Sequence, residues 1–445
     1  MNSFWFKALT LILALLPTAH AFAQEPLTLQ AAIERALARN TDIAVAKARL
    51  AESEATRFKA TTAFLPNIQA VGQYTHNSVE ATFDFGALIT RIAPPGLIDP
   101  TKLPGPSIIQ KQDTVSGALT VDETIFALSP ILLRSAASQQ VEAQEMSLEA
   151  ARHEIVYQIM QLFYTAAGLQ RVIQAAERAV SLAGQRIGNA QNRKAQGAEG
   201  EITVLRAQSE QDKAEQDLER ARLAQQQLLM ALGALLDLPT PQTLTAPEEL
   251  TVPQATTDEL LQQALRDRPD VLARRRSVGA LDTQVTEAQW RWLPFVTANF
   301  TGRYTDTPGF VGKNWLWSVT GNLVIPLFDR GQRYAEARER AQVGARLRSE
   351  LDRAELDTRS AILQTRAEIE TSRRTLQLAT GAAQKAKRTA EIMGKAQSAG
   401  AATSLEVAEA DTGLRLADVS VERERINLSL AILKLQHLIG AIRPR

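Results

Sequence analysis

Most of the chain places its hydrophobic positions in a heptad pattern. From Ile155 they alternate by four and three residues, at Ile159, Leu162, Ala166, Leu169, Ile173, Ala176, Val180, Ala183, Ile187 and Ala190. The pattern resumes at Val204 and returns from Val407, with polar exceptions at Gln211, Gln225 and Glu424. It keeps one face of a supercoiled helix buried, which predicts coiled-coil helices at about 131–193 and 331–397, each roughly 95 to 100 Å long. A dimeric coiled coil exposed to solvent would explain the heptads equally well.

Between these helical regions the hydrophobic period changes to two. Residues 296–304 and 315–325 alternate apolar or aromatic side chains with polar ones, and residues 68–75 and 115–122 do so in the first half. This alternation, over about ten residues, is typical of strands with lipid on one side and water on the other. Two soluble hairpins are the alternative, although the chain offers no other core candidate for them to pack against.

The chain contains two copies of one plan. Leu65-Pro66 aligns with Leu293-Pro294, and Gly197 with Gly400, at two different offsets. The offsets differ because residues 86–112 form a proline-rich insert in the first copy, whose composition predicts neither helix nor inner strand. We expect this insert to be the outer loop of the first hairpin.

The repeats predict the domain organisation. A first repeat at 24–238 contains a hairpin near 67–126, and a second repeat at 257–440 contains a hairpin near 295–327. In both, a long helix, a turn and a further helix follow the hairpin. Proline-rich residues 239–256 form the linker between the repeats.

The N-terminus predicts export. Lys7 precedes an apolar run at residues 8–16, and the Ala-Phe-Ala sequence at 21–23 fits a signal peptidase site. Residues 1–23 are therefore interpreted as a signal peptide; a membrane anchor is the alternative, but the run is far shorter than the roughly 20 apolar residues of a spanning helix. No other stretch has that length, so a mature chain that crosses a membrane must do so as a β-barrel.

Composition excludes several functions. The 445 residues include 50 Lys and Arg and 49 Asp and Glu, so removal of Lys7 with the signal peptide leaves balanced charges. This argues against a nucleic-acid partner. The chain has no Cys, which excludes disulfides, thiolate metal sites, a Cys nucleophile and a lipid-modified Cys.

The motifs indicate no enzyme. His153-Glu154 begins like a zinc-protease motif but lacks the second His, and residues 309–313 lack the spacing of a phosphate-binding loop. We therefore expect no catalytic residue, no metal and no cofactor. The strand count adds a structural requirement. Four strands cannot close a membrane barrel, for which about eight is the smallest number, so the chain must form oligomers: two copies would give eight strands and three would give twelve.

At the second strand-to-helix junction, residues 325–333 read Ile-Pro-Leu-Phe-Asp-Arg-Gly-Gln-Arg. With the two repeats and the Leu-Pro before the strands, this junction resembles the TolC-like outer membrane efflux proteins over residues 27–440. The resemblance implies a mainly α fold with a small β part. It further implies a homotrimer with a 12-stranded barrel in the outer membrane and a coiled-coil α-barrel tunnel through the periplasm, docked onto a periplasmic adaptor and an inner-membrane pump.

Two features depart from the family pattern. The first junction, residues 124–130, is a degraded version of the second. The Cys to which a lipid is attached in some relatives is absent, so anchoring in the outer-membrane lipid must depend on the barrel.

The turns at residues 194–203 and 397–404 are the candidate tip. Gly197, Gly200 and Gly400 offer the backbone freedom that a helix reversal requires. The resemblance implies that these turns meet the adaptor in the periplasm, with Ala198 and Ala401 as further contact positions.

The same segment contains candidate gate residues. The sequence Gly400-x-x-Thr403-x-x-Glu406-Val407-x-Glu409 resembles the family segment whose two acidic residues ring the periplasmic entrance. Residues three apart share a helix face, so a trimer would bring six carboxylates together. Arg206, at the position equivalent to Glu409 in the first repeat, is the candidate partner in an ion-pair latch. Two exposed glutamates on a solvated helix are the alternative.

These observations favour a passive export duct in the outer membrane. A periplasmic coiled-coil scaffold without channel activity is the alternative, and a soluble exported enzyme is a distant third. The exported substrate leaves no readable mark in the sequence.

Overall fold

The fold was analysed in a computed structural model, which describes residues 26–94, 96–103, 105–241, 243–307 and 312–442. The predicted signal peptide and its cleavage site lie outside these residues, and so do residues 308–311. Within the described part of the chain, no helix combines the length and the apolar character needed to cross a membrane.

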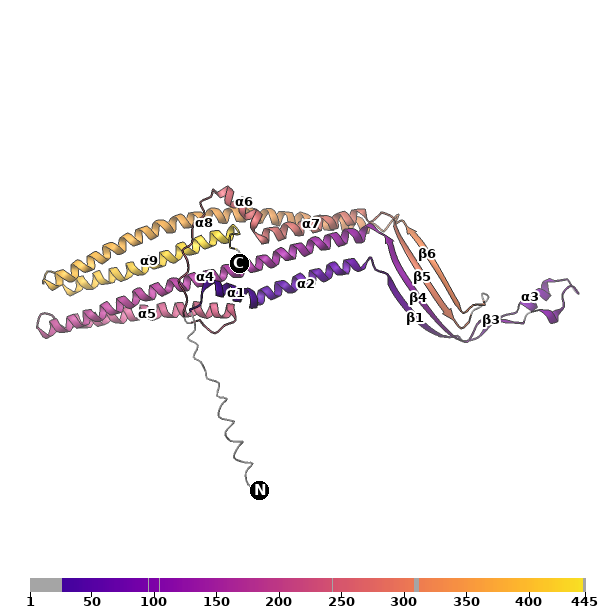
Figure 1. Cartoon of the computed structure of the whole chain (residues 1–445), viewed down its shortest axis with the longest axis horizontal. Coiled ribbons are helices and arrows are strands. Elements are labelled where there is room, and N and C mark those ends of the chain that lie inside the picture. The colour runs from indigo at the N-terminus through magenta and orange to yellow at the C-terminus, as the bar shows by residue number, and fades with distance from the viewer. Residues whose placement is uncertain (1–25, 95, 104, 242, 308–311, 443–445) are drawn as a thin grey trace, which may run out of the picture. The chain divides into compact units, whose positions relative to one another are not determined.

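The described elements form two tandem repeats of the same order (Figure 1). The first repeat consists of α1 (Leu29–Arg39), α2 (Thr41–Thr62), β1 (Asn67–His76), β4 (Asp113–Phe126), α4 (Leu128–Ala195) and α5 (Glu201–Leu236). The second consists of α6 (Thr257–Asp267), α7 (Pro269–Trp290), β5 (Phe295–Thr305), β6 (Trp315–Val324), α8 (Gln332–Ser398) and α9 (Ser404–Leu438). This order confirms the mainly α fold with a small β part and the two structural repeats.

The insert in the first hairpin has more structure than its composition predicted. It contains nearly all of α3 (Phe85–Ile92), a short 3₁₀ helix η1 (Pro100–Lys102) and β3 (Ser107–Gln110), and β2 (Ala81–Phe83) precedes it. The expectation of no helix in 86–112 was wrong because all the prolines of the insert follow α3, and the side chain of Asp84 caps α3 by accepting a hydrogen bond from the backbone N–H of Ala87. Among the described strands β3 pairs with β2 alone, so it is not an inner strand.

The four long strands form one antiparallel sheet in the order β1-β4-β5-β6. Its register aligns side chains of one kind across all four strands. One row contains Ile68, Val121, Phe300 and Val319, and the adjacent row, on the opposite face, contains Gln69, Thr120, Thr301 and Ser318. The sheet therefore has an apolar face and a polar face, as the alternation predicted.

The chain divides into two compact units, and each contains parts of both repeats. One unit combines the residues up to Val45 with Glu149–Pro269 and Glu355–Arg445. The other combines Ala46–Leu148 with Asp270–Ala354 and contains the four-stranded sheet.

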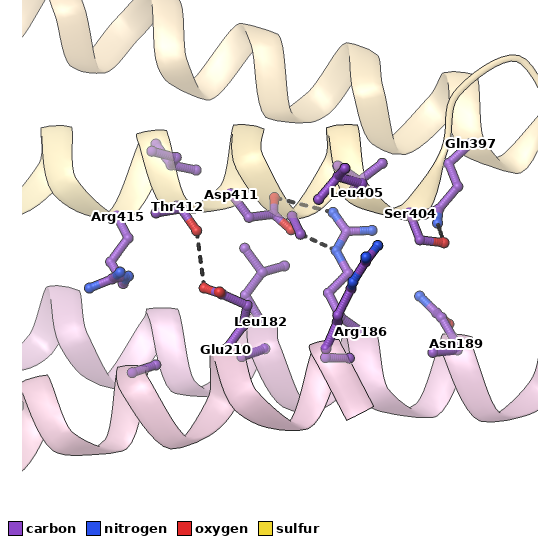
Figure 2. Close-up of a pocket in the computed structure, with 18 of the residues that line it drawn as sticks. Leu182, Arg186, Asn189, Glu210, Gln397, Ser404, Leu405, Asp411, Thr412 and Arg415 are labelled. Carbon is purple, nitrogen blue, oxygen red and sulfur yellow. Dashed lines mark hydrogen bonds and ion pairs between the residues drawn. The ribbon is translucent and has the colours of Figure 1, made fainter. Parts of the chain in front are cut away.

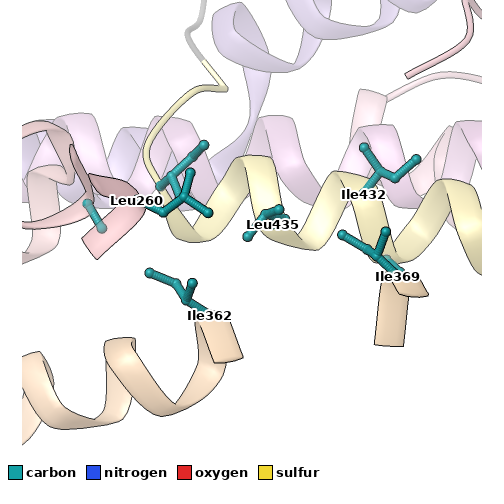
Figure 3. Close-up of a cluster of buried hydrophobic side chains, with 8 residues drawn as sticks. Leu260, Ile362, Ile369, Ile432 and Leu435 are labelled. Carbon is teal, nitrogen blue, oxygen red and sulfur yellow. The ribbon is translucent and has the colours of Figure 1, made fainter. Parts of the chain in front are cut away.

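The core of the first unit lies where its helices meet. In one cluster, Leu260 of α6 and Ile362 and Ile369 of α8 pack with Ile432 and Leu435 of α9 (Figure 3). A second cluster joins Ile173 and Ala176 of α4 to Leu218 of α5. These α4 residues belong to the predicted heptad stripe, so the stripe forms a coiled-coil contact.

α4 and α8 contain 68 and 67 residues. At 1.5 Å per residue each helix is about 100 Å long. The turns that follow α4 and α8, the candidate tip, belong to the first unit, and the sheet belongs to the second.

Candidate functional site at the helix turns

The two long helices end in the same turn geometry. Gly197 and Gly400 have φ angles of +70° and +75°, a left-handed conformation that Gly adopts without the penalty of a Cβ. In each turn the next residue donates its N–H to a carbonyl five residues back: Ala198 to Arg193 at 2.9 Å and Ala401 to Ala396 at 2.8 Å. This bond is the signature of a Schellman motif, so the two repeats reverse direction in the same way.

The returning helices begin differently in the two repeats. Gly200 precedes α5 with a φ of −88° and provides no side-chain cap. The prediction that this position requires the backbone freedom of glycine was wrong, because any residue adopts this extended conformation. At the equivalent position before α9, Thr403 forms a capping box with Glu406. The Glu406 carboxylate accepts hydrogen bonds from the N–H of Thr403 at 2.7 Å and from its hydroxyl at 2.9 Å.

An open groove of about 1290 Å³ lies beside these turns, within the first unit. Its lining comes from α4, α5, α8 and α9 and from the two turns (Figure 2). Small apolar side chains cover much of it: Ala175, Ala179, Ala183, Ala190, Ala198, Ala207, Ala214, Ala402 and Ala408. Charged side chains, mostly cationic, lie among them.

Polar contacts join α9 to α4 and α5 across the groove. The guanidinium of Arg186 on α4 donates to both carboxylate oxygens of Asp411 on α9, at 2.7 and 3.3 Å (Figure 2). The hydroxyl of Thr412 donates to Glu210 of α5 at 3.2 Å. Further along, Arg415 forms an ion pair with Asp217. The Arg186 pair is the strongest of these contacts by geometry, since it is bidentate and largely buried.

A second set of contacts joins the two turns directly. Glu199 of the first turn lies 2.9 Å from Nε of Arg193 and accepts a hydrogen bond from the hydroxyl of Ser404. Ser404 accepts in turn from the side-chain amide of Gln397 at 2.9 Å, and Arg193 donates to the backbone carbonyl of Gln397 at 3.1 Å. The turn after α4 and the turn after α8 are therefore fixed to each other.

The predicted gate residues lie at the start of α9 and α5. Glu406 and Glu409 are exposed, and Arg206 is exposed on the wall of the groove. Among the described residues of this single chain, no hydrogen bond or ion pair connects Arg206 to either glutamate. Hydrogen bonds from the backbone and then the side chain of Thr403 lower the pKa of Glu406. The carboxylate ring and its latch stay predictions, because both require more than one copy of the chain.

The predicted tip positions are all exposed in the structure. Gly197, Ala198, Gly200, Gly400 and Ala401 lie in the two turns, and Ala198 also lines the groove. Sequence reasoning missed the cross-contacts of Arg186, Glu199 and Asp411. Arg186 precedes the seam position Ile187 and Asp411 follows the seam position Ala410, so charges beside the seam indicated contacts between helices. The pattern gave no means of choosing the partner of each.

Comparison with known proteins places this architecture in a family. The family model described as outer membrane efflux protein matches residues 32–237 and 260–441. The chain belongs to the outer membrane efflux protein family. The match covers nearly all of both repeats and includes the two turns.

Individual proteins and solved structures give further comparisons. The chain is 28% identical over 200 residues to the cobalt-zinc-cadmium resistance protein CzcC of Cupriavidus metallidurans, and 30% identical over 249 residues to the protein CyaE of Bordetella pertussis. These matches cover 44% and 52% of the chain, which spans about half the length of these relatives, 47% and 50%. The crystal structure of the outer membrane protein VceC from Vibrio cholerae is similar with a TM-score of 0.75 at 19% identity, over 93% of this chain and 96% of that one.

Proposed function

We propose that the protein is a passive export duct of the outer membrane, formed by three copies of the chain. The observation that carries this proposal is the apolar face of the four-stranded sheet. Trp317, Val319 and Leu323 on that face are each about two-thirds exposed. Exposed apolar patches of this kind mark contact with a membrane or with another protein, while the polar opposite face suits water.

The edges of the sheet support assembly from several copies. β1 and β6 are the outer strands, and within the described residues each pairs on one side alone. An unpaired edge strand is a template for another chain. Pairing of β6 of one copy with β1 of the next would close a ring, and three copies would supply the twelve strands that the family resemblance implies.

The long helix pairs, α4 with α5 and α8 with α9, support a periplasmic tunnel. A helix of about 100 Å with a continuous heptad seam is far longer than a compact domain requires, and the turns at its end are fixed to each other by Glu199 and Ser404. In this proposal the turns face the periplasm and contact an adaptor protein, and an inner-membrane pump supplies the energy for export.

Fractionation of cells without detergent tests the proposal. We expect the full chain in the outer membrane, and we expect the purified protein to crosslink as a trimer and conduct ions in planar bilayers. Recovery in the soluble periplasmic extract without conductance would favour the coiled-coil scaffold instead. A crosslinked dimer that conducts would retain the duct and overturn the trimer.

A further inference from the structure

We infer that Arg303 forms a cationic ring inside the assembled channel, and that this ring binds multivalent anions. The inference rests on the proposed function, in which three copies of the sheet close around a lumen and the polar face turns towards water. It adds to that function a specificity-determining residue and a chemical class of ligand. Three observations carry it: the position of Arg303 on the polar face, the apolar residues beside it, and the contacts of its guanidinium.

Arg303 lies on the polar face of the four-stranded sheet. It follows Thr301 by two residues on β5, and alternate residues of a strand share a face. Arg303 is exposed. Within β1, β4, β5 and β6, all of which the structure describes, the polar face has two charged residues per chain, Arg303 and Asp122. The potential of this face therefore depends on these two positions.

Asp122 lies among groups that form hydrogen bonds with it. Its row of the sheet contains Asn67, Asn299 and Thr320. The side-chain amide of Asn299 donates to the Asp122 carboxylate at 2.6 Å. A carboxylate that already accepts from its neighbours has less need of a ligand.

The row of Arg303 offers its guanidinium no side-chain acceptor. Its register partners are Val71, Ala118 and Leu316, whose side chains contain no oxygen or nitrogen. Among the described contacts, no hydrogen bond or ion pair involves the guanidinium. Arg has five N–H donors, and apolar surroundings strengthen the attraction of a charge for its ligand. An anion in the lumen would supply the missing acceptors.

Assembly brings three such cations to one level of the lumen. The register of the sheet is the same in every copy, so a threefold axis places the three Arg303 side chains at one height. Twelve strands about 4.8 Å apart and tilted by about 40° enclose a lumen about 24 Å wide between backbones, and side chains narrow it. The Debye length in physiological salt is about 8 Å, so the potentials of the three charges extend towards the axis. Rings of Arg or Lys favour anions in pores.

The rows on both sides of the ring are polar. Their members are Gln69, Thr120, Thr301 and Ser318 on one side and Gln73, Ser116 and Thr305 on the other. Hydroxyl and amide groups can donate hydrogen bonds to an anion, so they add to the cationic ring without competing with it. A multivalent anion gains most, because it interacts with several cations at once.

Single-channel recordings of the purified, assembled channel test this inference. The probe is inorganic pyrophosphate, added at constant ionic strength to both sides of a planar bilayer in potassium chloride. We expect pyrophosphate to block the wild-type channel. Arg303→Gln should raise the half-blocking concentration about tenfold, because three exposed charge contacts are lost. The same variant should raise the permeability ratio of potassium over chloride.

Three further variants separate the charge of Arg303 from its position. Arg303→Lys keeps the cation and should keep most of the block. Lys313→Gln removes an exposed cation from the connection between β5 and β6, outside both strands, and should leave the block unchanged. Asp122→Asn removes the carboxylate of the polar face and should strengthen the block.

Introduced thiols determine which face lines the lumen. The chain has no Cys, so Arg303→Cys and Val319→Cys each provide a unique thiol. We expect an anionic methanethiosulfonate reagent to modify the Arg303→Cys variant and change its conductance, and to leave the Val319→Cys variant unmodified in lipid. The reverse result would place the polar face against the membrane. It would overturn the inference and make lipid phosphate the ligand of Arg303.

Several results would overturn the inference. Equal block of wild type and Arg303→Gln would show that the ring binds no anion. Equal weakening of the block by Arg303→Gln and Lys313→Gln would assign the effect to net charge. Loss of the block in Arg303→Lys would exclude the charge as its cause. A channel that conducts and whose Arg303→Cys thiol reacts, but that pyrophosphate does not block, would retain the proposed function and contradict this inference alone.

Discussion

Gly197 and Gly400 have a conformational role that a neighbouring glycine lacks. Both adopt positive φ, whereas Gly200 is extended. A Cβ added at Gly197 or Gly400 would meet no atom within 4 Å, so backbone strain alone distinguishes these positions. The sequence predicted a reversal at both turns, but it could not separate Gly197 from Gly200, because both are glycines within one short turn.

Substitution of Gly400 tests this difference. We expect Gly400→Ala to lower the free energy of local opening at the turn by about 1 to 2 kcal/mol, the cost of a left-handed residue with a Cβ. Gly400→Asn should cost less, because Asn tolerates this conformation, and Gly200→Ala should have little effect. Hydrogen exchange of the Ala401 amide, which donates to Ala396, measures the change. Equal costs for Gly200→Ala and Gly400→Ala would contradict the assignment.

Glu287 is the residue that sequence reasoning missed most completely. Its side chain is fully buried and accepts hydrogen bonds from Arg291 at 2.9 and 3.0 Å, from Arg340 at 2.6 Å and from the hydroxyl of Ser129. Its partners lie near the ends of α4, α7 and α8 that adjoin the strands in sequence. The equivalent position in the first repeat is Lys59, so the duplication gave no sign of a buried carboxylate.

Removal of this charge should destabilise the protein. We expect Glu287→Gln to lower the free energy of unfolding by about 3 kcal/mol, because Arg291 and Arg340 lose a buried partner. The control is Glu142→Gln, which removes an exposed partner of Arg276 and should cost less than about 1 kcal/mol. Thermal unfolding of the purified protein, followed by circular dichroism, compares the two. Equal effects would show that burial adds nothing at this position.

The same carboxylate makes stability depend on pH. Burial alone raises the pKa of Glu287, but hydrogen bonds from Arg291, Ser129 and Arg340 outweigh it, and the net pKa lies below the ordinary value of 4.5. Its contribution is therefore complete above that ordinary value and is lost as pH falls through the lowered pKa. We expect the stability difference between wild type and Glu287→Gln to shrink in this acidic range alone. A difference that shrinks above pH 6 would contradict the sign of the shift.

At the scale of elements, the heptad pattern predicted the seam but not its full surroundings. Ile155 and Ile173 of the predicted stripe are buried, but so are Val156, Phe163 and Val172 beside it. α4 has a second contact, since Ile426 of α9 lies against Gly168. A single sequence reveals the periodic hydrophobic stripe of a helix. The packing of a further helix against it depends on contacts between distant segments, which produce no separate periodicity in the sequence.

The polar exceptions in the seam have partners in the structure. The side-chain amide of Gln225 on α5 donates to Gln170 and to the carbonyl of Ala166 on α4. Glu424 on α9 accepts a hydrogen bond from the hydroxyl of Thr375 on α8 at 2.9 Å. Buried polar groups need such partners, so these positions interrupt the apolar seam without leaving it unsatisfied.

The outer insert is the element whose removal should matter least. Residues 97–106 follow α3 and precede β3, and they contain the 3₁₀ helix alone. We expect deletion of these residues to leave assembly intact, because an outer loop, as predicted for this insert, neither donates to a ladder nor contacts lipid. Crosslinking of the purified protein measures the trimer fraction, and a Gly/Ser replacement of equal length is the control for loop length. Loss of the trimer in both variants would assign a bracing role to the insert.

At the scale of the whole molecule, the repeats and the strand pattern predicted the need for several copies. The two-residue period identified the strands and the face that each side chain occupies, because the period in a strand is invariant. The order β1-β4-β5-β6 pairs strands from the two repeats, and a pairing between distant segments has no local signal. The predicted gate belongs to the same scale, because Glu406 and Glu409 would form a ring in an assembly of several copies alone.

A carboxylate ring of Glu406 and Glu409, which stays a prediction, would set the ion selectivity of the assembled channel. Crowded carboxylates at a constriction attract cations and disfavour anions. We expect the Glu406→Gln, Glu409→Gln double variant to show lower cation selectivity and weaker block by divalent cations in single-channel recordings. Gln at position 406 retains the capping-box pattern with Thr403, so α9 should still begin at the same residue and assembly should not change.

A matched variant and a pH series complete this test. Glu370→Gln with Glu391→Gln removes the same charge from exposed positions of α8 and should leave selectivity unchanged. The lowered pKa of Glu406 keeps its carboxylate charged below the pH at which an ordinary glutamate is protonated, so part of the selectivity should persist there. Unaltered selectivity and block in the Glu406 and Glu409 double variant would show that these side chains do not line the pore, and Glu406 would then act in the helix cap alone.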